Sequence, residues 1–400
     1  MPSITPYKIS VPDSSLSKLK SKLSDSTFPS EVDFSDSWDY GTPLSGVKRF
    51  ATYWRDHFDW RAQEKLLNEK LPQFTTTVET DNFGPLKMHF VHQKGKGKKN
   101  IPLLFCHGWP GSFLEVMKIL PLLTQGNEEG VSFDVVAPSL PNYAFSEGVK
   151  KKNFGTPQYA EAIHKVMLNL GYEKYVTQGG DWGYHITRLI GVMYPNHCLA
   201  SHINFVVISK EDLKPYVEAT GISLTQEEKA GIARTNWFHE EGSRYNYEQS
   251  TKPSTIGFAL ADSPIALLSW IYEKLHDWTD AYPWTDDEIL TWVSIYQFSI
   301  AGPEASVRIY YEAMHTQKEL MKKRLDYNAK VKLGISYFPR DLCIPPSEFS
   351  KKLGDVVFER RHKDGGHFAA HERPELLVGD LMEMFGPEGG AGDVAQKVAV

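Results

Sequence analysis

The spacing of apolar residues changes several times along the chain, and each change predicts a different kind of element. In the first seventy-odd residues the spacing is helical. Leu16, Leu19 and Leu23 recur at intervals of three and four, and a second stretch of this kind runs from about residue 44 to residue 58. We therefore predict an N-terminal arm of helices over residues 1–73.

After the arm the period becomes two, which is typical of strands. Apolar residues alternate at 74–78 and again at 86–90 around the turn Gly84-Pro85, and this pattern predicts a β-hairpin. Farther along, short apolar runs alternate with helical stretches, and the predicted strands cover residues 101–106, 133–137, 175–178, 335–338 and 356–360. This alternation predicts an α/β protein whose mostly parallel sheet is covered by helices on both faces.

A long helical segment interrupts the strand pattern. Residues 209–320 hold five of the ten Trp and eight of the nineteen Tyr, whereas strand spacing resumes only near residue 335. A helical insertion between strands is expected to form a lid over the ends of the strands, where α/β sheets place their ligands. We thus predict a core over 74–208 and 321–400, with residues 386–400, rich in Gly and Ala, as a loose tail.

Composition narrows the class of protein without choosing a function. The 400 residues are 41% hydrophobic and 24% charged, and the net charge of −6 gives no basic field to attract nucleic acid. The three cysteines, Cys106, Cys198 and Cys343, lie far apart, which favours free thiols inside a cell. No apolar run approaches 18 residues and no secretory leader is evident, so we expect a cytoplasmic protein without a membrane span.

One glycine-rich turn carries the main candidate for chemistry. Gly179-Gly180-Asp181-Trp182-Gly183 lies between a predicted strand and a predicted helix. Small residues two before and two after a central polar residue permit a strained turn that presents the central side chain above the sheet. A carboxylate there, ionised at neutral pH, suits attack on a saturated carbon that bears a leaving group. The alternative is a turn whose Asp181 only caps the helix.

Two further segments follow predicted strands and face the same place. His107-Gly108-Trp109-Pro110-Gly111-Ser112 is a turn that can aim the backbone N–H of Trp109, together with that of Trp182, into an oxyanion hole. His367, after the last predicted strand, is placed to act as a base. The alternative for the first segment is a Gly/Pro turn with a packed histidine.

A third partner is needed to orient the imidazole of His367. Asp341 follows the preceding predicted strand, and Glu348 and Asp355 are alternatives. A nucleophile, an acid and a base in this order along the chain are typical of the α/β-hydrolase fold. His367 and His371 are four residues apart, but without an HExxH pattern or a third ligand they do not predict a metal site.

Four motifs in sequence order support a family resemblance. HGWPGS, GGDWG, FPRDL and GGHFAAHERPE together resemble the microsomal-type epoxide hydrolases of the α/β-hydrolase superfamily, especially the soluble fungal members. The stretches 249–257 and 262–266 are similar to the lid of that family, and the helical arm is also a feature of this branch. The resemblance therefore covers nearly the whole chain.

The resemblance implies a role for each of several residues. It implies a nucleophile, a base, a charge-relay acid, two lid tyrosines that hydrogen-bond the epoxide oxygen, and two oxyanion-hole N–H groups: Asp181, His367, Asp341, Tyr245, Tyr310, Trp109 and Trp182. Tyr311 is adjacent to Tyr310, and aligning Arg308 and Glu312 with the family selects Tyr310. The implied reaction opens an epoxide to a vicinal diol through an ester on Asp181, which water then hydrolyses.

The same resemblance also leads to expectations about reactants, cofactors and oligomeric state, and it leaves two alternative functions to consider. It implies an epoxide and water as reactants, no cofactor or metal, a role in detoxification or aromatic hydrocarbon catabolism, and a homodimer as in fungal relatives. Mammalian relatives carry a membrane anchor before the arm, and this chain begins almost at the arm, which again favours the cytoplasm. The nearest alternative is a haloalkane dehalogenase, which typically has Asn where Trp109 stands. A non-catalytic ligand-binding α/β-hydrolase is the alternative of another class.

Overall fold

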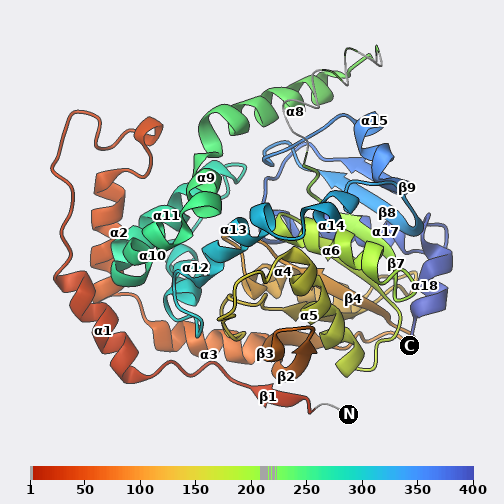
Figure 1. Ribbon diagram of the computed structural model, residues 1–400, viewed down its shortest axis with the longest axis horizontal. Helices are drawn as coiled ribbons and strands as arrows, with labels where there is room; N and C mark the ends of the chain where they lie inside the picture. Colours follow the sequence, from red (N-terminus) through yellow and green to blue (C-terminus); the bar gives the residue numbers. More distant parts are fainter. Residues whose placement is uncertain (1–2, 208–214, 216–217, 219–220, 222) are drawn as a thin grey trace.

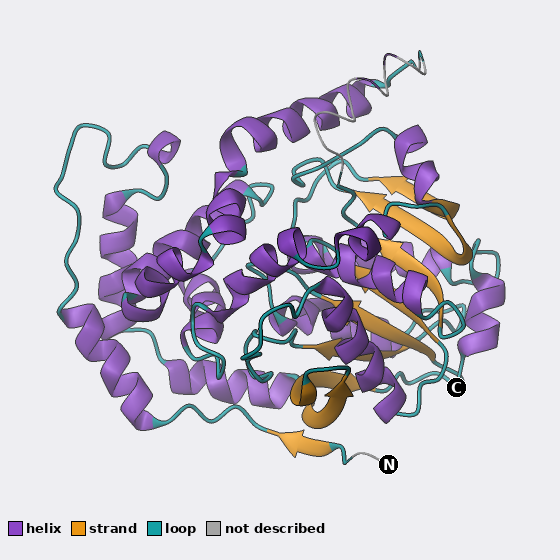
Figure 2. Cartoon of the chain, in the orientation of Figure 1, coloured by secondary structure: helices purple, strands orange, loops and turns teal. Residues whose placement is uncertain are grey.

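The computed structural model describes residues 3–207, 215, 218, 221 and 223–400 (Figure 1). The predicted boundary between core and lid, at residues 208 and 209, lies outside the described residues. Figure 2 shows strands at the centre of the core with helices on both of their faces.

One mixed sheet organises the described part of the chain. Its nine strands are ordered β1-β2-β3-β5-β4-β6-β7-β8-β9. β4 to β9 are parallel, whereas β1, β2 and β3 pair antiparallel to their neighbours. The strands are β1 (Thr5–Tyr7), β2 (Gln73–Thr80), β3 (Gly84–Gln93), β4 (Ile101–Cys106), β5 (Phe133–Pro138), β6 (Tyr175–Gly179), β7 (Cys198–Ile203), β8 (Asn328–Tyr337) and β9 (Gly354–Arg361). The sheet confirms the predicted α/β-hydrolase fold and the predicted hairpin of β2 and β3.

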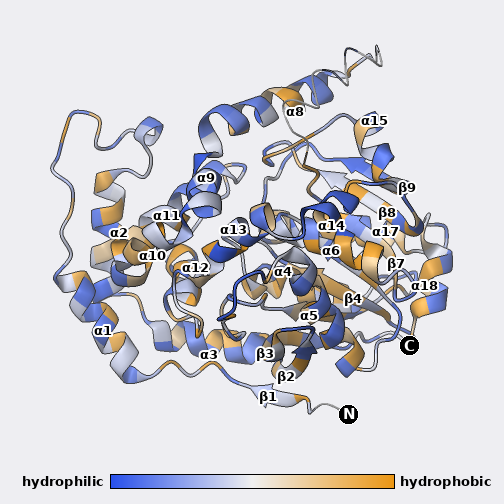
Figure 3. Ribbon diagram, in the orientation of Figure 1, coloured by the Kyte–Doolittle hydropathy of each residue, from blue (hydrophilic) through white to orange (hydrophobic). Residues whose placement is uncertain are grey.

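The central strands are apolar because both of their faces are covered. Every residue of β4, β5 and β6 is buried, as expected for parallel strands between two layers of helices. The one carboxylate in β5, Asp134, is paired by local donors, since it accepts hydrogen bonds from Gly95 N at 2.8 Å and from Tyr172 Oη at 2.7 Å. Figure 3 shows hydrophobic residues concentrated along the sheet and in α6 (Trp182–Met193).

Helices of the core pack against the sheet in pairs. α5 (Thr156–Asn169) packs on α6, and α4 (Val116–Gln125) packs on α17 (Pro374–Met384). Two short helices, α15 (Ser347–Ser350) and α16 (Ala369–Glu372), follow β8 and β9. This arrangement leaves the carboxyl ends of β4, β6, β8 and β9 open to the loops that follow them.

The described part of the N-terminal segment forms one short strand, three α-helices and the 3-10 helix η1 (Trp38–Tyr40). α1 (Asp13–Ser24) is followed by α2 (Leu44–Asp56) and α3 (Trp60–Lys70), so the helical stretch predicted from residue 44 to 58 ends near residue 56. The break occurs because the Asp59 carboxylate accepts a hydrogen bond from Ala62 N, which starts α3. β1 was not predicted, since three residues are too few to show a period.

Several helices come between β7 and β8. Among the described residues they are α8 (Gln226–Trp237), the π-helical turn η3 (Phe238–Gly242), α9 (Arg244–Thr251), α10 (Pro253–Asp262), α11 (Pro264–Asp277), α12 (Asp286–Gln297), the 3-10 helix η4 (Ala305–Val307), α13 (Arg308–His315) and α14 (Lys318–Lys323). Proline at the first position of α10 and of α11 begins each helix without losing a hydrogen bond. Within the described residues, no single helix has the length and apolar character of a membrane span; only α10 and α11 together meet both criteria, and they are bent by 114°.

The prediction of a loose tail over residues 386–400 is wrong. α18 (Gly392–Val398) buries Val394 and Val398, and Asn100 and Val400 exchange two backbone hydrogen bonds of 3.0 Å. The prediction failed because the glycines are required for close packing rather than for flexibility. A Cβ at Gly390 would collide with the backbone of Val357 in β9. The glycine-rich composition therefore allows contact with the core.

Val398→Asp tests the packed tail. We expect it to lower the free energy of unfolding by about 2 kcal/mol or more, because the new carboxylate would be buried without a partner. Val398 is only 3% exposed, whereas Val400 is 60% exposed, so Val400→Asp is the matched control and should change stability by less than about 0.5 kcal/mol. Urea unfolding of both variants is the measurement, and equal stabilities would contradict the packed tail.

Candidate active site

Asp181 lies in a strained turn between β6 and α6. Its backbone has φ 48° and ψ −126°, a conformation that L-residues rarely adopt. A Cβ at Gly183 would collide with the carbonyl oxygen of Cys106 at the end of β4, and one at Gly179 would lie 2.6 Å from the carbonyl of Gly183. The turn is thus possible only because these two positions are glycine.

The turn after β4 brings a hydrogen-bond donor to this carboxylate. Trp109 N donates to Asp181 Oδ1 at 2.7 Å, and the peptide bond between Trp109 and Pro110 is cis. Two side chains of α12 hold this turn, since Trp292 Nε1 donates to the carbonyl of Pro110 and Tyr296 Oη to that of Gly111. Gly108 must be small as well, because a Cβ there would overlap Asp181.

The first N–H of α6 is the second candidate donor. Trp182 directly follows Asp181 and begins the helix, so its backbone N–H has no acceptor within the helix. The N-terminus of α6 also carries partial positive charge, which favours a carboxylate at Asp181. Both predicted oxyanion-hole residues therefore adjoin the turn.

His367 lies between two carboxylates. Its Nε2 is 3.4 Å from Asp181 Oδ2, and its Nδ1 is 2.6 Å from Asp341 Oδ1. Glu348 and Asp355, the alternatives to Asp341, are both exposed, and Glu348 forms a surface ion pair with Lys351. The structure thus brings Asp341 to the imidazole and leaves the two alternatives away from it.

The protonation of His367 is governed by these neighbours. Burial lowers the pKa of its imidazole, but the carboxylates of Asp341 and Asp181 outweigh burial and raise the pKa above its usual range. An imidazolium between two carboxylates is thereby favoured at neutral pH. Loss of either negative charge would bring the pKa of His367 down.

The loop that carries Asp341 is held by an arginine that the sequence analysis did not single out. Arg234, in α8, donates to the backbone carbonyls of Asp341 and Arg340 at 3.2 Å and of Asp277 at 2.6 Å. Leu342 N donates to Asp341 Oδ1 at 2.7 Å. No local signal marks Arg234, since its partners lie more than forty residues away along the chain.

Two tyrosines from the helices between β7 and β8 cover the carboxylate. Tyr245 in α9 stacks on the indole of Trp109, with ring centroids 5.3 Å apart and planes at 16°. Tyr310 in α13 meets the ring of Trp182 edge-on at 4.8 Å. Tyr311 is 38% exposed and stacks on His315, so the structure brings Tyr310 and not its neighbour to the site.

Both phenols are kept in the protonated form. Burial raises the pKa of Tyr245 and of Tyr310 well above the usual value, and the charge of Asp181 adds to this. A neutral phenol can donate a hydrogen bond to a substrate oxygen. The site therefore pairs one anionic oxygen with two buried donors.

A partly buried glutamate was missed by the sequence analysis. Glu115 lines the same small cavity as Asp181 and His367, together with Gln178 and Asn204. The pKa of Glu115 is raised to about 8, because burial and the charge of Asp181 together outweigh the opposing charge of His367. Its place three residues after HGWPGS was the available signal.

The loop with His367 is tied to the segment after α11. His367 N donates to the carbonyl of Trp278 at 2.8 Å. The carboxylate of Glu372 accepts hydrogen bonds from Phe368 N at 3.1 Å and from Asp280 N at 2.8 Å. The backbone of the base is thus fixed to the inserted helices rather than to the core alone.

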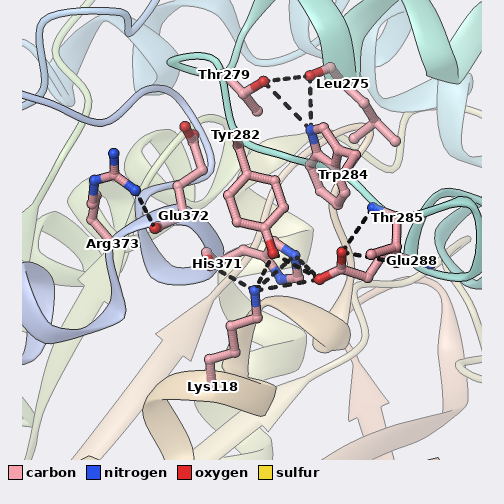
Figure 4. A network of polar contacts seen from close by, with 10 residues as sticks. All are labelled: Lys118, Leu275, Thr279, Tyr282, Trp284, Thr285, Glu288, His371, Glu372 and Arg373. Atoms are coloured by element: carbon pink, nitrogen blue, oxygen red, sulfur yellow. Dashed lines mark hydrogen bonds and ion pairs between the residues drawn. The ribbon is translucent and has the colours of Figure 1, made fainter.

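A second network lies beside Glu372 and contains His371. In Figure 4, Lys118 points from α4 toward Tyr282, His371 and Glu288. His371 Nε2 is 3.3 Å from both Lys118 Nζ and Glu288 Oε1. His371 therefore stabilises the contact between α4 and α12 and does not join His367 at one site.

Comparison with known proteins identifies the family. A family model described as "Epoxide hydrolase N terminus" matches residues 4–116, and one described as "alpha/beta hydrolase fold" matches residues 101–203. Epoxide hydrolase 1 of Sus scrofa is 32% identical over 418 aligned residues, which cover 96% of this chain and 89% of that protein. The chain belongs to the epoxide hydrolase family.

Solved structures show that the similarity to epoxide hydrolases extends over nearly the full length of the chain. The epoxide hydrolase of Aspergillus niger has a TM-score of 0.84 and 36% identity, covering 99% of this chain and 97% of its own. The juvenile hormone epoxide hydrolase of Bombyx mori has a TM-score of 0.89 and 26% identity, covering 99% and 96%. Both the N-terminal helices and the inserted helices thus have counterparts in this family.

Gly183→Ala tests the requirement for glycine in the turn of this epoxide hydrolase. We expect it to lower the free energy of unfolding by about 2 kcal/mol, because the added Cβ overlaps the carbonyl of Cys106. Gly379 in α17 is the matched control, since it is exposed and a Cβ there meets nothing. Gly379→Ala should stabilise the protein by about 0.5–1 kcal/mol. Thermal unfolding of the pair measures both effects, and a stable Gly183→Ala variant would refute the close approach.

Proposed function

We propose that this protein converts epoxides to vicinal diols through a covalent ester on Asp181. The observation that carries the proposal is one constellation: Asp181 lies 3.4 Å from His367, and Tyr245 and Tyr310 pack on the rings of Trp109 and Trp182 beside it. A carboxylate nucleophile beside two acid donors suits the opening of a strained ether.

In the first half-reaction Asp181 attacks a ring carbon of the epoxide. Its Oδ1 is held by Trp109 N at 2.7 Å, whereas Oδ2 has only the longer contact of 3.4 Å with His367, so Oδ2 is the nucleophilic oxygen. A bond forms between Oδ2 and the carbon while the bond from that carbon to the ring oxygen breaks. The developing alkoxide is stabilised by the hydroxyls of Tyr245 and Tyr310, from which it obtains a proton.

Ester formation prepares the base for the second half-reaction. Once Asp181 is esterified it carries no charge, and its contribution to the raised pKa of His367 is lost. Only Asp341 then supports the imidazolium, so His367 becomes neutral as its proton passes to the phenolate that protonated the alkoxide, which restores the tyrosine. The first step thus lowers the pKa of His367, which would otherwise stay protonated and could not act as a base.

Water then hydrolyses the ester. Neutral His367 takes a proton from water through Nε2, and the oxygen attacks the carbonyl carbon of the ester. The tetrahedral oxyanion is stabilised by the N–H groups of Trp109 and Trp182, and removal of one such donor typically costs about 10²–10³-fold in rate. The intermediate then collapses: the bond from the carbonyl carbon to the diol oxygen breaks, and that oxygen takes the remaining proton of the attacking water. Asp181 is again a carboxylate and His367 an imidazolium, and the diol leaves with one oxygen that came from Asp181. A cytoplasmic location, a homodimer and a role in detoxification stay predictions.

A single turnover in ¹⁸O-labelled water tests the ester mechanism. With enzyme in excess over epoxide, we expect the diol of the first turnover to be unlabelled, because its new oxygen comes from Asp181. Mass spectrometry of the diol is the measurement. Full labelling in that turnover would mean direct attack by water and would refute the ester.

Asp181→Asn provides the matched variant for this experiment. The amide is a poor nucleophile of the same size, so the variant should fold and form no ester.

Halide release from haloalkanes by the unmodified enzyme, with no turnover of epoxides, would instead support the dehalogenase alternative.

Asp341→Asn separates the two half-reactions. Removing this charge lowers the pKa of His367 and weakens the orientation of its ring, so ester hydrolysis should slow by about 10³–10⁴-fold while the ester still forms. The pH profile of hydrolysis should shift to lower pH, because the remaining imidazole loses its proton more readily. Intact-protein mass spectrometry should show the ester accumulating.

Glu348→Gln is the matched control for the Asp341→Asn variant. Glu348 also follows β8 but forms only a surface ion pair with Lys351. This variant should keep the full rate of both half-reactions. A slow Glu348→Gln variant, or an Asp341→Asn variant with normal hydrolysis, would remove Asp341 from the role.

A further inference from the structure

Lys274 is a buried cation that the proposed mechanism leaves unused. It lies near the end of α11, and its side chain is only 3% exposed. A lysine is rarely buried to this degree without a specific partner. Its ammonium forms an ion pair with the carboxylate of Glu273, which is 29% exposed and lies on the outer side.

The ammonium also lies against the ring of Tyr245. Lys274 Nζ is 4.8 Å from the centroid of that ring and 5.4 Å from the centroid of Trp270. Both distances are within the range of a cation–π contact, which is strongest where water is excluded. Tyr245 is itself buried, so the positive charge is poorly screened at this point.

A second pair of residues between α11 and α9 supports the contact of Lys274 with Tyr245. Trp270 Nε1 donates to the buried Gln249 Oε1 at 3.0 Å. Trp270 and Lys274 are four residues apart in α11, and Tyr245 and Gln249 are four apart in α9, so each pair shares one helix face. The position of the ammonium therefore does not depend on one contact.

Most of the other groups around Tyr245 act against loss of its proton. Burial, Asp181, Cys343 and Glu273 raise the pKa of its phenol, whereas the hydrogen bond with Tyr310 lowers it. When the phenol donates to an alkoxide, negative charge spreads onto the Tyr245 ring. A cation that faces this ring stabilises that charge.

We propose that Lys274 is a positioning residue that makes Tyr245 a better donor to the epoxide oxygen. The proposal rests on the function proposed above. Lys274 acts on the first half-reaction only, because hydrolysis of the ester places its charge on the oxyanion beside Trp109 and needs no acid at Tyr245. Loss of its charge should therefore slow the opening of the ring without slowing the release of diol.

Lys274→Met, which keeps the length of the side chain and removes the charge, is the principal test. We expect single-turnover formation of the ester to slow by roughly tenfold, with the rate of ester hydrolysis unchanged. Lys274→Arg should restore most of the rate of ring opening, since a guanidinium also binds an aromatic face. Equal slowing of both half-reactions, or no slowing, would overturn the proposal.

A double-mutant cycle with Tyr245→Phe distinguishes electrostatics from packing. In the Tyr245→Phe background, Lys274→Met should slow ester formation by less than about twofold, because the donor it assists is gone. A purely structural Lys274 would cost the same factor in both backgrounds, and that result would contradict the proposal.

Glu273→Gln keeps the proposal falsifiable if Lys274→Met does not fold. Glu273 raises the pKa of Tyr245, so its removal should leave ester formation unchanged or faster. If the ion pair were merely structural, this variant would slow ester formation as Lys274→Met does. Unmodified enzyme that opens no epoxide would refute the proposed function itself, whereas active enzyme with normal Lys274→Met kinetics would refute only this role of Lys274.

Discussion

Three ionisable groups, Asp181, His367 and Asp341, are gathered in the interior of the protein, where a single unpaired charge would be costly. They are stable together because the imidazolium separates the two carboxylates and because backbone N–H groups of Trp109 and Leu342 satisfy one oxygen of each. Each of the three follows a different parallel strand. The arrangement therefore requires β6, β8 and β9 to run in the same direction, with their carboxyl ends at one edge.

The inserted helices do more than cover this edge. They supply the two phenols, and through Trp278 and Asp280 they also hold the backbone of the loop that carries His367. Arg234 similarly holds the loop of Asp341 from α8. Base, acid and donors are consequently positioned by the same group of helices, so a displacement of that group would disturb all of them together.

The sequence predicted the parts of this structure that have a local cause. The hairpin of β2 and β3 follows from alternation around Gly84-Pro85, and the turn at Asp181 follows from glycines that no other residue could replace. The resemblance to a family then singled out Tyr245 and Tyr310, which composition could not. Their predicted roles are supported by their place beside Trp109 and Trp182 and stay proposals until they are measured.

Other features could not be predicted because they depend on residues far apart in the chain. Arg234, Glu372 and Lys274 look like ordinary polar residues of helices, and only the tertiary structure brings them to Asp341, Asp280 and Tyr245. The segment around residue 390 is rich in glycine, as a loose tail would be, yet it packs closely against the core. Local pattern describes backbone requirements well and says little about which long-range contacts a polar side chain makes.

The backbone pairing of Asn100 with Val400 has a practical consequence for handling the protein. It fixes Val400 just before β4, at the amino ends of the parallel strands. Asp181 lies beyond the other end of the sheet, about one strand length away, or roughly 20 Å for six residues. A purification tag or a surface linker joined after Val400 would therefore emerge on the side opposite the carboxylate and leave the approach of small molecules unobstructed.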